Sequence, residues 1–511
     1  MGKGKAKAKA RKGSKSVERE IARHAMAGFE AARDTRRTAG WWGTASGPNG
    51  DLRQAWHWLV KRHQDLADND GYAKRAIGVI VNNWIGDGIM SNPTNGTKRY
   101  NKLWQQWADV IESDFYETHN WYGNQAVGSR TTAVRGAVLV RKRVFPEILE
   151  KYGLVPLQVQ MLEPDWLDFN KDNSNDVLFG QQFDSSGRLQ GYWIRDNHPG
   201  ESVLGTNVRV QSTFVPKSEI SLHFDCQRAG QRMGLPFGTA AILTLRDMGD
   251  IRAAQQMKDK ISACFFGVSY DSDPTGSDKL TDEEGNPILG IEFDEIEPGA
   301  VQHLPPGRDF KAFSPPSSGD FVSTHREYAH SVAAAYEITY ESMTGDLSNV
   351  NYSSFRGGWL EFSRRIAYLR GKVSMPSMLS PVCRWHDELA RMSGLLEGPA
   401  VAWAHTPPRR EMIDPTKEIP ALILAVRAGF MSLSEVQLSF GYVPKEIIEE
   451  LAKDMQNARD SGLILSTDAG LVSNAGVTQA RPAGSAFTSS APDPSAEEGE
   501  SAEGQPFTPA L

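Results

Sequence analysis

Apolar residues near the start of the folded chain recur every three or four positions, which is the spacing of one face of a helix. One such run covers residues 73–84 and ends at Gly86, so a helix with a glycine stop is expected there. A second helix is expected over residues 102–115, with Trp104 and Trp107 on its apolar face. These two side chains could form a base-stacking platform, but at this spacing core packing is the favoured interpretation.

Strand signals follow in the next part of the chain, and residues 157–161 alternate apolar and polar side chains, which is typical of a half-buried strand. Strands are expected over residues 138–145, 157–161 and 220–224. A hairpin is expected over residues 178–194, with its turn at Asp184-Ser-Ser-Gly187. The first half of the chain is therefore predicted to be a mixed α+β region.

Two long helices are expected to flank a short insertion. The first covers residues 239–266, which is about 40 Å at the helical rise per residue, and the second covers residues 319–340. Prolines and glycines prevent long helices between them, so a small β-rich or irregular module is expected there. Residues 282–297 are strongly acidic; they could repel DNA, present a docking surface or form a plain solvated loop.

Glycine and asparagine interrupt the helical pattern after the second long helix. A third helix is expected over residues 353–370, and a helical module over residues 414–462. From about residue 466 the chain is rich in Ser, Ala, Gly, Pro and Glu and poor in large apolar residues, so this tail is expected to be disordered.

The composition is that of an ordinary soluble protein large enough for two to four modules, with 511 residues, 40% hydrophobic and 23% charged. A net charge of -7 excludes a chain that is basic throughout, so any contact with DNA would come from local patches or from a passage that does not grip it. Cys226, Cys264 and Cys383 lie far apart, which argues against a disulfide framework or a zinc site. No apolar run has the length of a membrane span, and none follows the first basic residues as in a signal peptide, so a protein that is neither inserted nor secreted is expected.

The first residues form a basic arm with no acid among them. The arm is expected to be flexible, and it is either a solvated tail or a contact for nucleic acid or an acidic partner. The cations proposed for such a contact are Lys3, Lys5, Lys7, Lys9, Arg11 and Lys12.

A search for catalytic motifs finds no phosphate loop of an ATP-driven motor, no nucleophile elbow and no His-Glu-x-x-His helix. The nearest carboxylate site is Glu163-Pro-Asp165 at the end of a strand, a position where nucleases hold metal ions. Asp168 or Asp225 could supply a further acid. A turn closed by proline with solvated acids is the favoured interpretation.

Other polar residues on predicted helices are weaker candidates. His57 and His63 are six positions apart, which does not place them on one helical face, so they are not expected to be a metal pair. Arg364, Arg365 and Arg370 could bind phosphates, but a solvated face or a subunit salt bridge is the more common role of such residues.

Several stretches, taken together and in order, resemble the portal proteins of lambda-type tailed bacteriophages. The most specific is Gly345-Asp-Leu-Ser-Asn-Val-Asn-Tyr-Ser-Ser354, and the resemblance runs from about Trp41 to Leu465. The others are Tyr72-Ala-Lys-Arg-Ala-Ile-Gly78, Gly86-Asp-Gly-Ile89, Arg141-Lys-Arg-Val-Phe-Pro146, Leu162-Glu-Pro-Asp-Trp-Leu167, Gln231-Arg-Met-Gly234 and Asp414-Pro-Thr-Lys417.

The resemblance implies the α+β portal fold, in which a wing, a stem, a clip and a crown assemble as a closed ring. Carried onto this sequence, it implies a flexible basic arm at 1–40, the wing at 41–238, a first stem helix at 239–266, the clip at 267–318, a second stem helix at 319–340, a tunnel loop at 341–353, a long helix returning to the wing at 354–413, a helical crown at 414–465 and a disordered tail at 466–511.

The same resemblance implies a structural role in the virion rather than an enzyme, with no cofactor, metal ion or membrane. The ring, normally of twelve subunits, would stand at the unique capsid vertex after assembly in the host cytoplasm, and double-stranded DNA would be packaged and ejected through it. It would dock the terminase large subunit and a head-completion or connector protein, and contact the major capsid and scaffold proteins. A metal-dependent nucleic-acid enzyme using Glu163 and Asp165, and a capsid scaffold protein without a channel, are the alternatives.

The expected tunnel loop is polar and contains no cation before Arg356. A channel must hold a polyanion without trapping it, and each fixed cation adds to the cost of release. Gly345 permits a sharp backbone turn at its start. The residues expected to face the DNA are Thr344, Gly345, Asp346, Ser348, Asn349, Asn351, Tyr352 and Ser353.

Overall fold

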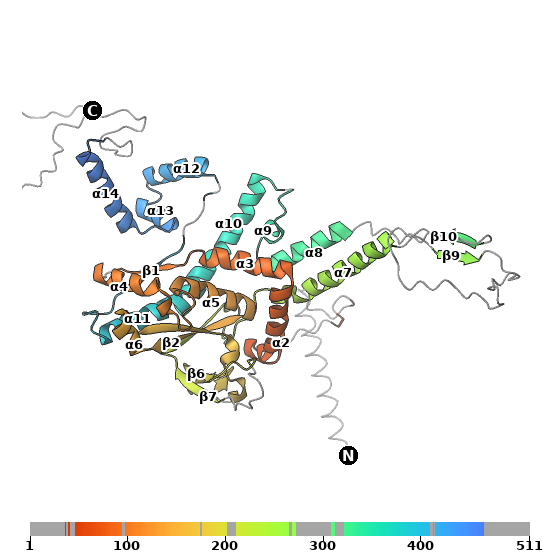
Figure 1. The fold of residues 1–511 in the computed structure, drawn as a ribbon, viewed down its shortest axis with the longest axis horizontal. Helices are drawn as coiled ribbons and strands as arrows, with labels where there is room; N and C mark the ends of the chain where they lie inside the picture. Colours follow the sequence, from red (N-terminus) through yellow and green to blue (C-terminus); the bar gives the residue numbers. More distant parts are fainter. Residues whose placement is uncertain are drawn as a thin grey trace, which may run out of the picture. The chain divides into compact units, whose positions relative to one another are not determined.

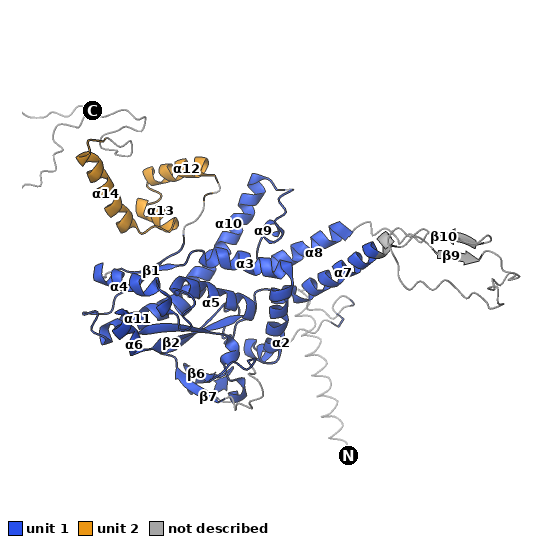
Figure 2. Cartoon of the chain, in the orientation of Figure 1, with its two compact units in different colours: residues 1–408 blue, residues 409–511 orange. Residues whose placement is uncertain are grey.

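In the computed structural model, the chain divides into two compact units, Met1–Pro408 and Arg409–Leu511 (Figure 2). The structure describes residues 36, 39–40, 46–94, 98–173, 176–201, 211–264, 268–271, 308–311, 321–348, 350–408, 412 and 414–463. The basic-arm cations, most of the expected clip, Asn349 and the tail from residue 464 lie outside the described residues.

The first unit begins with two helices that share one capping residue. α2 (Pro48–Asn69) and α3 (Gly71–Ile85) pack on each other and on α5 (Trp121–Arg135) (Figure 1). Asp70 separates them, and its carboxylate accepts hydrogen bonds from the backbone N–H groups of Tyr72 and Ala73. α3 ends at Gly86, whose φ of 55° suits glycine, so the predicted stop is confirmed.

A three-stranded antiparallel sheet forms the centre of this unit. Its strand order is β3 (Leu157–Leu162), β2 (Ala137–Val144), β8 (Ile220–Phe224); the sequence predicted these three strands but not their order. Val138 and Val140 belong to the core cluster that includes the helices, whereas Leu139 belongs to the cluster that includes the second sheet. The two faces of β2 therefore support two different cores.

The second sheet is antiparallel and has four strands. Its order is β4 (Val177–Leu178), β5 (Gln181–Phe183), β6 (Leu189–Arg195) and β7 (Ser212–Pro216). The predicted hairpin turn is confirmed between β5 and β6: Asp184 Oδ1 accepts the N–H groups of Ser186 and Arg188 at 2.9 and 2.8 Å, and Gly187 has a φ of 79°.

Two tryptophans of α4 (Lys98–Ala108) pack in the core of the first unit. Trp104 and Trp107 are fully buried, with ring centroids 5.2 Å apart, so their assignment to the core is confirmed. α4 ends at Ala108, earlier than the expected residue 115, and a 3₁₀ turn at Ile111–Ser113 follows. Strand β1 (Met90–Pro93) pairs with β11 (Trp403–Thr406), which the sequence pattern did not predict. A short helix, α6 (Pro146–Tyr152), connects β2 to β3.

The two long helices lie side by side in Figure 1. α7 (Ile242–Cys264) begins after a 3₁₀ turn at Thr239–Ala241, and α8 (Phe321–Ala335) follows the antiparallel strand pair β9 (Val268–Asp271) and β10 (Arg308–Lys311). α8 stops five residues before Tyr340, the expected end. The backbone leaves the helix at Glu337, whose φ is 57°.

The connection after α8 is followed by a nearly continuous helical segment. α9 (Tyr340–Thr344) packs on α3, and α10 (Tyr352–Tyr368) continues through a π-helical stretch (Leu369–Leu379) into α11 (Ser380–Met392). The third helix was expected to end at residue 370, so it is longer than predicted. None of the helices in the described ranges is both long and apolar enough to cross a membrane.

The second unit contains three helices, α12 (Pro415–Arg427), α13 (Leu433–Ser439) and α14 (Pro444–Asp460) (Figure 2). The expectation that residues 414–462 are helical is confirmed. These three helices have no fully buried side chain among the described residues, and Phe430 is 84% exposed.

Candidate functional site

The segment that was expected to form the tunnel loop includes most of α9 and the connection between α9 and α10. α9 ends at Gly345, which has a φ of 75° and donates its N–H to Glu341 O at 2.8 Å. A residue in this left-handed conformation is a common helix stop, and glycine adopts it without a steric cost. Thr344 and Gly345 therefore belong to the end of a helix, and the loop itself runs from residue 345 to residue 351.

Local hydrogen bonds fix the shape of this loop. Asp346 Oδ1 accepts from the backbone N–H of Ser348 at 3.0 Å and from its hydroxyl at 2.6 Å. These bonds to Ser348 are the main reason why the pKa of Asp346 lies below its usual value. The N–H of Asp346 is 3.2 Å from Thr344 Oγ1, the acceptor. The carboxylate is thus used to hold a turn.

The far end of the loop is a capping box. Asn351 Oδ1 accepts the N–H of Ser354 at 2.8 Å, and Ser354 Oγ accepts the N–H of Asn351 at 3.2 Å. The sequence interpretation assigned Asn351 a DNA-facing role and missed this structural one. Asn followed three residues later by Ser is the signal that could have revealed it.

The loop side chains are open to solvent. Leu347 is 61% and Tyr352 is 41% exposed, and Ser348 and Ser353 are exposed as well. The structure thus brings the described candidates of this site together on one exposed segment, as their proximity in sequence requires.

Cations from other helices lie next to α9, although the loop itself has none. The Arg326 guanidinium of α8 lies 5.4 Å from the centre of the Tyr340 ring, and the ring of His330 stacks on the same Tyr340 ring with centroids 4.1 Å apart. Arg75 of α3 donates from Nε to Ser342 O at 3.2 Å. The sequence could not reveal these neighbours, because they come from helices that are distant along the chain.

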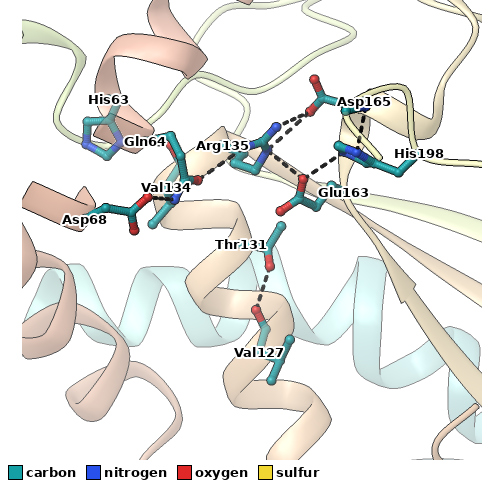
Figure 3. Close-up of polar contacts among 11 residues, drawn as sticks. His63, Gln64, Asp68, Val127, Thr131, Val134, Arg135, Glu163, Asp165 and His198 are labelled. Atoms are coloured by element: carbon teal, nitrogen blue, oxygen red, sulfur yellow. Dashed lines mark hydrogen bonds and ion pairs between the residues drawn. The ribbon is translucent and has the colours of Figure 1, made fainter. Parts of the chain in front are cut away.

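The carboxylates of Glu163 and Asp165 lie beside a guanidinium (Figure 3). Arg135, the last residue of α5, places Nη2 2.8 Å from Asp165 Oδ2 and Nε 3.1 Å from Glu163 Oε2. His198 Nε2 lies 3.1 Å from the same Glu163 oxygen. Pro164 begins a 3₁₀ turn, Pro164–Trp166, that holds the two acids on one side.

One ligand atom from each of Glu163, Asp165 and His198 lies within 4.8 Å of the others, which is close enough to hold a metal ion. The donor set fits an ion poorly, however, because the Arg135 guanidinium already contacts both carboxylates, and a dication there would be repelled by it. We derive no metal chemistry from this cluster.

The two further acids nominated from the sequence have other partners. Asp168 pairs with Arg195 at 3.2 Å, and Asp225 pairs with Arg365 at 2.8 Å. Among the described residues, neither joins the cluster of Glu163, Asp165 and His198. The convergence that a nuclease would need is therefore missing from this part of the chain.

The two histidines of α2 have separate environments. His63 is buried between Val134 O at 2.8 Å and the Tyr336 hydroxyl at 2.9 Å, and burial lowers its pKa. His57 lies against the rings of Trp56 and Phe169. The expectation that they are not a metal pair agrees with these contacts.

The three arginines of the α10 region serve the protein's own structure. Arg364 pairs with Glu361 at 2.9 Å on the surface, and Arg365 pairs with Asp225. Arg370 donates to Trp84 O and Asn83 O, each at 2.7 Å, so it caps the end of α3. Arg364 and Arg365 thus form ion pairs within the chain, whereas the sequence interpretation was a solvated face or a salt bridge between subunits.

Comparison with known proteins identifies relatives over most of the chain. The family model described as phage portal protein, lambda family, matches residues 34–370. A protein described as a probable portal protein, from Halomonas phage phiHAP-1, is 25% identical over 490 residues, which cover 89% of this chain and 91% of the relative.

Two solved structures are similar at low identity. A chain from the virion of a native gene transfer agent particle is 16% identical, with a TM-score of 0.45, and the match covers 76% of this chain and 94% of that one. An HK97 family phage portal protein from Corynebacterium diphtheriae is 11% identical, with a TM-score of 0.33, and the match covers 70% of this chain and 97% of that one.

Proposed function

The chain belongs to the lambda family of phage portal proteins, and we propose that it forms a closed ring whose axial channel is narrowed by the loop of residues 345–351. In this proposal double-stranded DNA passes through the ring at the capsid vertex during packaging and ejection. α7 and α8 are the stem helices, β9 and β10 are part of the clip, and α12 to α14 are the crown.

The pair of long helices is the observation that carries the ring proposal. Beyond Met248, no described side chain of α7 is fully buried, and Leu243 and Met257 are 70% and 58% exposed. Val322 and Tyr328 of α8 are exposed too. Exposed apolar side chains along a helix pair are typical of a surface that is buried in an assembly. A head-to-tail contact that closes by rotation would cover them and produce a ring.

The chemistry of the loop supports its assignment to the constriction. Its described side chains offer an acid that is already hydrogen-bonded, two neutral polar groups and an exposed leucine. Such a surface does not neutralise phosphates, so it releases no counterions and does not trap DNA. The hydrogen bonds of Asp346 and Asn351 hold the loop in one shape, as a constriction requires.

The proposed partners follow from this role. They are further copies of the chain, DNA in transit, the terminase large subunit, a head-completion or connector protein, and the major capsid and scaffold proteins. The proposal includes no catalytic step.

Leu347 offers a direct test of the loop assignment, because its exposed side chain can be exchanged without removing any of the hydrogen bonds that hold the loop. Leu347→Lys would add one cation per subunit to the constriction. We expect slower DNA release from filled particles and a steeper dependence of the release rate on salt, since each phosphate contact adds about 0.9 to the salt exponent.

Two matched variants separate position from composition. Leu347→Gln removes the same apolar group without adding a charge, and Met392→Lys adds the charge at an exposed position of α11. Both should release DNA as the unchanged protein does. If Leu347→Lys and Met392→Lys behave alike, the loop does not line the narrowest part of the path.

A further inference from the structure

A basic pocket lies at the end of β2, on the stretch Arg141-Lys-Arg-Val-Phe-Pro146 that the proposed channel does not use. Its volume is about 310 Å³. The residues that line it are Arg141, Lys142, Arg143, Val144, Phe145 and Glu219.

Strand geometry divides the three cations between two faces of the sheet. Side chains alternate along β2, so Arg141 and Arg143 follow Leu139 on the face of the second core, and Lys142 points to the opposite face. The Lys142 ammonium is accordingly paired there with Glu388 of α11 at 2.9 Å. The pocket therefore receives two guanidinium groups from positions two residues apart, about 7 Å along the strand.

Arg141 is half-buried and has no hydrogen-bond or ion-pair partner among the side chains of the described chain. Burial, followed by the neighbouring charge of Arg143, lowers its pKa. Glu219 and Asp196 act in the opposite direction, but neither forms an ion pair with it. A half-buried cation next to a like charge is costly unless an anion compensates it.

Arg143 is held in place by aromatic rings. Its guanidinium carbon lies 5.0 Å from the centre of the Phe115 ring and 5.8 Å from that of Phe145, and these two rings stack on each other. A guanidinium braced in this way loses little freedom when it binds a ligand. The head group is thus preorganised rather than free in solvent.

From these contacts we infer that Arg141 and Arg143 form a binding pocket for a single phosphate group of the DNA backbone. The two non-bridging oxygens of a backbone phosphate can accept paired N–H donors from two guanidinium groups. The choice of DNA rests on the proposed function, in which DNA is the polyanion that the ring meets. The volume of about 310 Å³ is ample for one phosphate group. The pocket is formed by other residues than the loop of residues 345–351, so either assignment can fail without the other.

The test uses the full-length protein and a short fluorescent DNA duplex, with binding followed by anisotropy at several salt concentrations. The double variant Arg141→Gln, Arg143→Gln should reduce the slope of log K against log salt by about one, not two, because both residues hold the same phosphate. The double variant Lys61→Gln, Arg62→Gln removes the same two units of charge from exposed positions of α2, outside the pocket, and should leave the slope unchanged. Melting curves establish that each variant is folded.

Three results would overturn the inference. An unchanged slope in the variant of Arg141 and Arg143 would show that the pocket does not contact DNA, and an equal change in the variant of Lys61 and Arg62 would show a general effect of net charge. Inorganic phosphate and a poly-glutamate peptide are the two other probes. Loss of binding to either one in the variant of Arg141 and Arg143, with DNA binding intact, would assign the pocket to free phosphate or to an acidic protein segment.

Discussion

Replacement of Asn351 by alanine should loosen the start of α10. The side chain oxygen that accepts the N–H of Ser354 at 2.8 Å is lost, while the backbone of Asn351 remains bonded to the Ser354 hydroxyl. An asparagine cap is worth about 1 kcal/mol relative to alanine. Because the first turn of α10 is exposed, we expect this loss as local fraying rather than as a lower stability of the whole unit.

Hydrogen exchange of the amides in residues 352–358 measures this fraying. A loss of about 1 kcal/mol corresponds to roughly five-fold faster exchange in this segment. Asn351→Asp is the matched control, since aspartate caps as well as asparagine and its charge is favourable at a helix N-terminus. Exchange in α5, which is distant in sequence, should not change in either variant.

The reasoning would be refuted if the aspartate variant exchanged as fast as the alanine variant, or if α5 accelerated equally. The comparison also matters for studies of DNA passage. A packaging defect in Asn351→Ala that is absent from Asn351→Asp would come from the disordered start of α10, not from lost contact with DNA.

Three further predictions concern the core of the first unit. Asp165→Ala should lower the free energy of unfolding by about 1.5–3 kcal/mol, because Arg135 loses charged hydrogen bonds; Mn²⁺ should not raise the Tm of the unchanged protein, and a rise that this variant abolishes would support a metal site instead. Burial lowers the pKa of His386 to about 3. The unfolded chain therefore binds more protons than the folded chain between pH 6.5 and 3. As the pH is lowered through that range, the free energy of unfolding should decrease by about 1.4 kcal/mol per pH unit for this imidazole. Denaturant titrations of His386→Phe at several pH values should show a correspondingly smaller dependence of the free energy of unfolding on pH. Gly234→Ala would place its Cβ 1.9 Å from Gly136 O, so a loss of at least about 3 kcal/mol is expected in thermal melts, and a near-native Tm would contradict this packing.

The elements that the sequence predicted well are those with a local cause. Gly86 ends α3, and Asp184 with Gly187 turns the hairpin, because one backbone conformation at one residue decides each. The length of α7 follows from its apolar repeat and from the prolines after it. β2 was predicted as a strand, but its first four residues are all apolar and buried, so the sequence did not reveal that its two faces support different cores.

The end of α8 was predicted wrongly because its cause is tertiary. Residues 335–340 contain neither glycine nor proline, and a continued helix was the natural expectation. In the structure Tyr336 is buried against His63, and Glu337 adopts a left-handed conformation with its carboxylate 2.7 Å from Arg365. These partners come from distant parts of the chain, so no local pattern could reveal them.

The candidate sites also combine local features, which the sequence reveals, with tertiary contacts, which it does not. Their positions in the chain could be read from composition, and the contacts that determine their chemistry could not. Arg135 converts the pair of Glu163 and Asp165 from a potential metal site into an ion-pair cluster, and it precedes them by about thirty residues. Asn351 is similar, since its role in the cap depends on the backbone geometry of α10.

The ring is the central claim of this account, and electron microscopy of the purified full-length protein tests it most directly. The account predicts closed rings with an axial hole, in which α7 and α8 of neighbouring subunits contact each other and residues 345–351 line the narrowest point. Isolated monomers at concentrations where portal rings form, or rings whose narrowest point is lined by another segment, would contradict it.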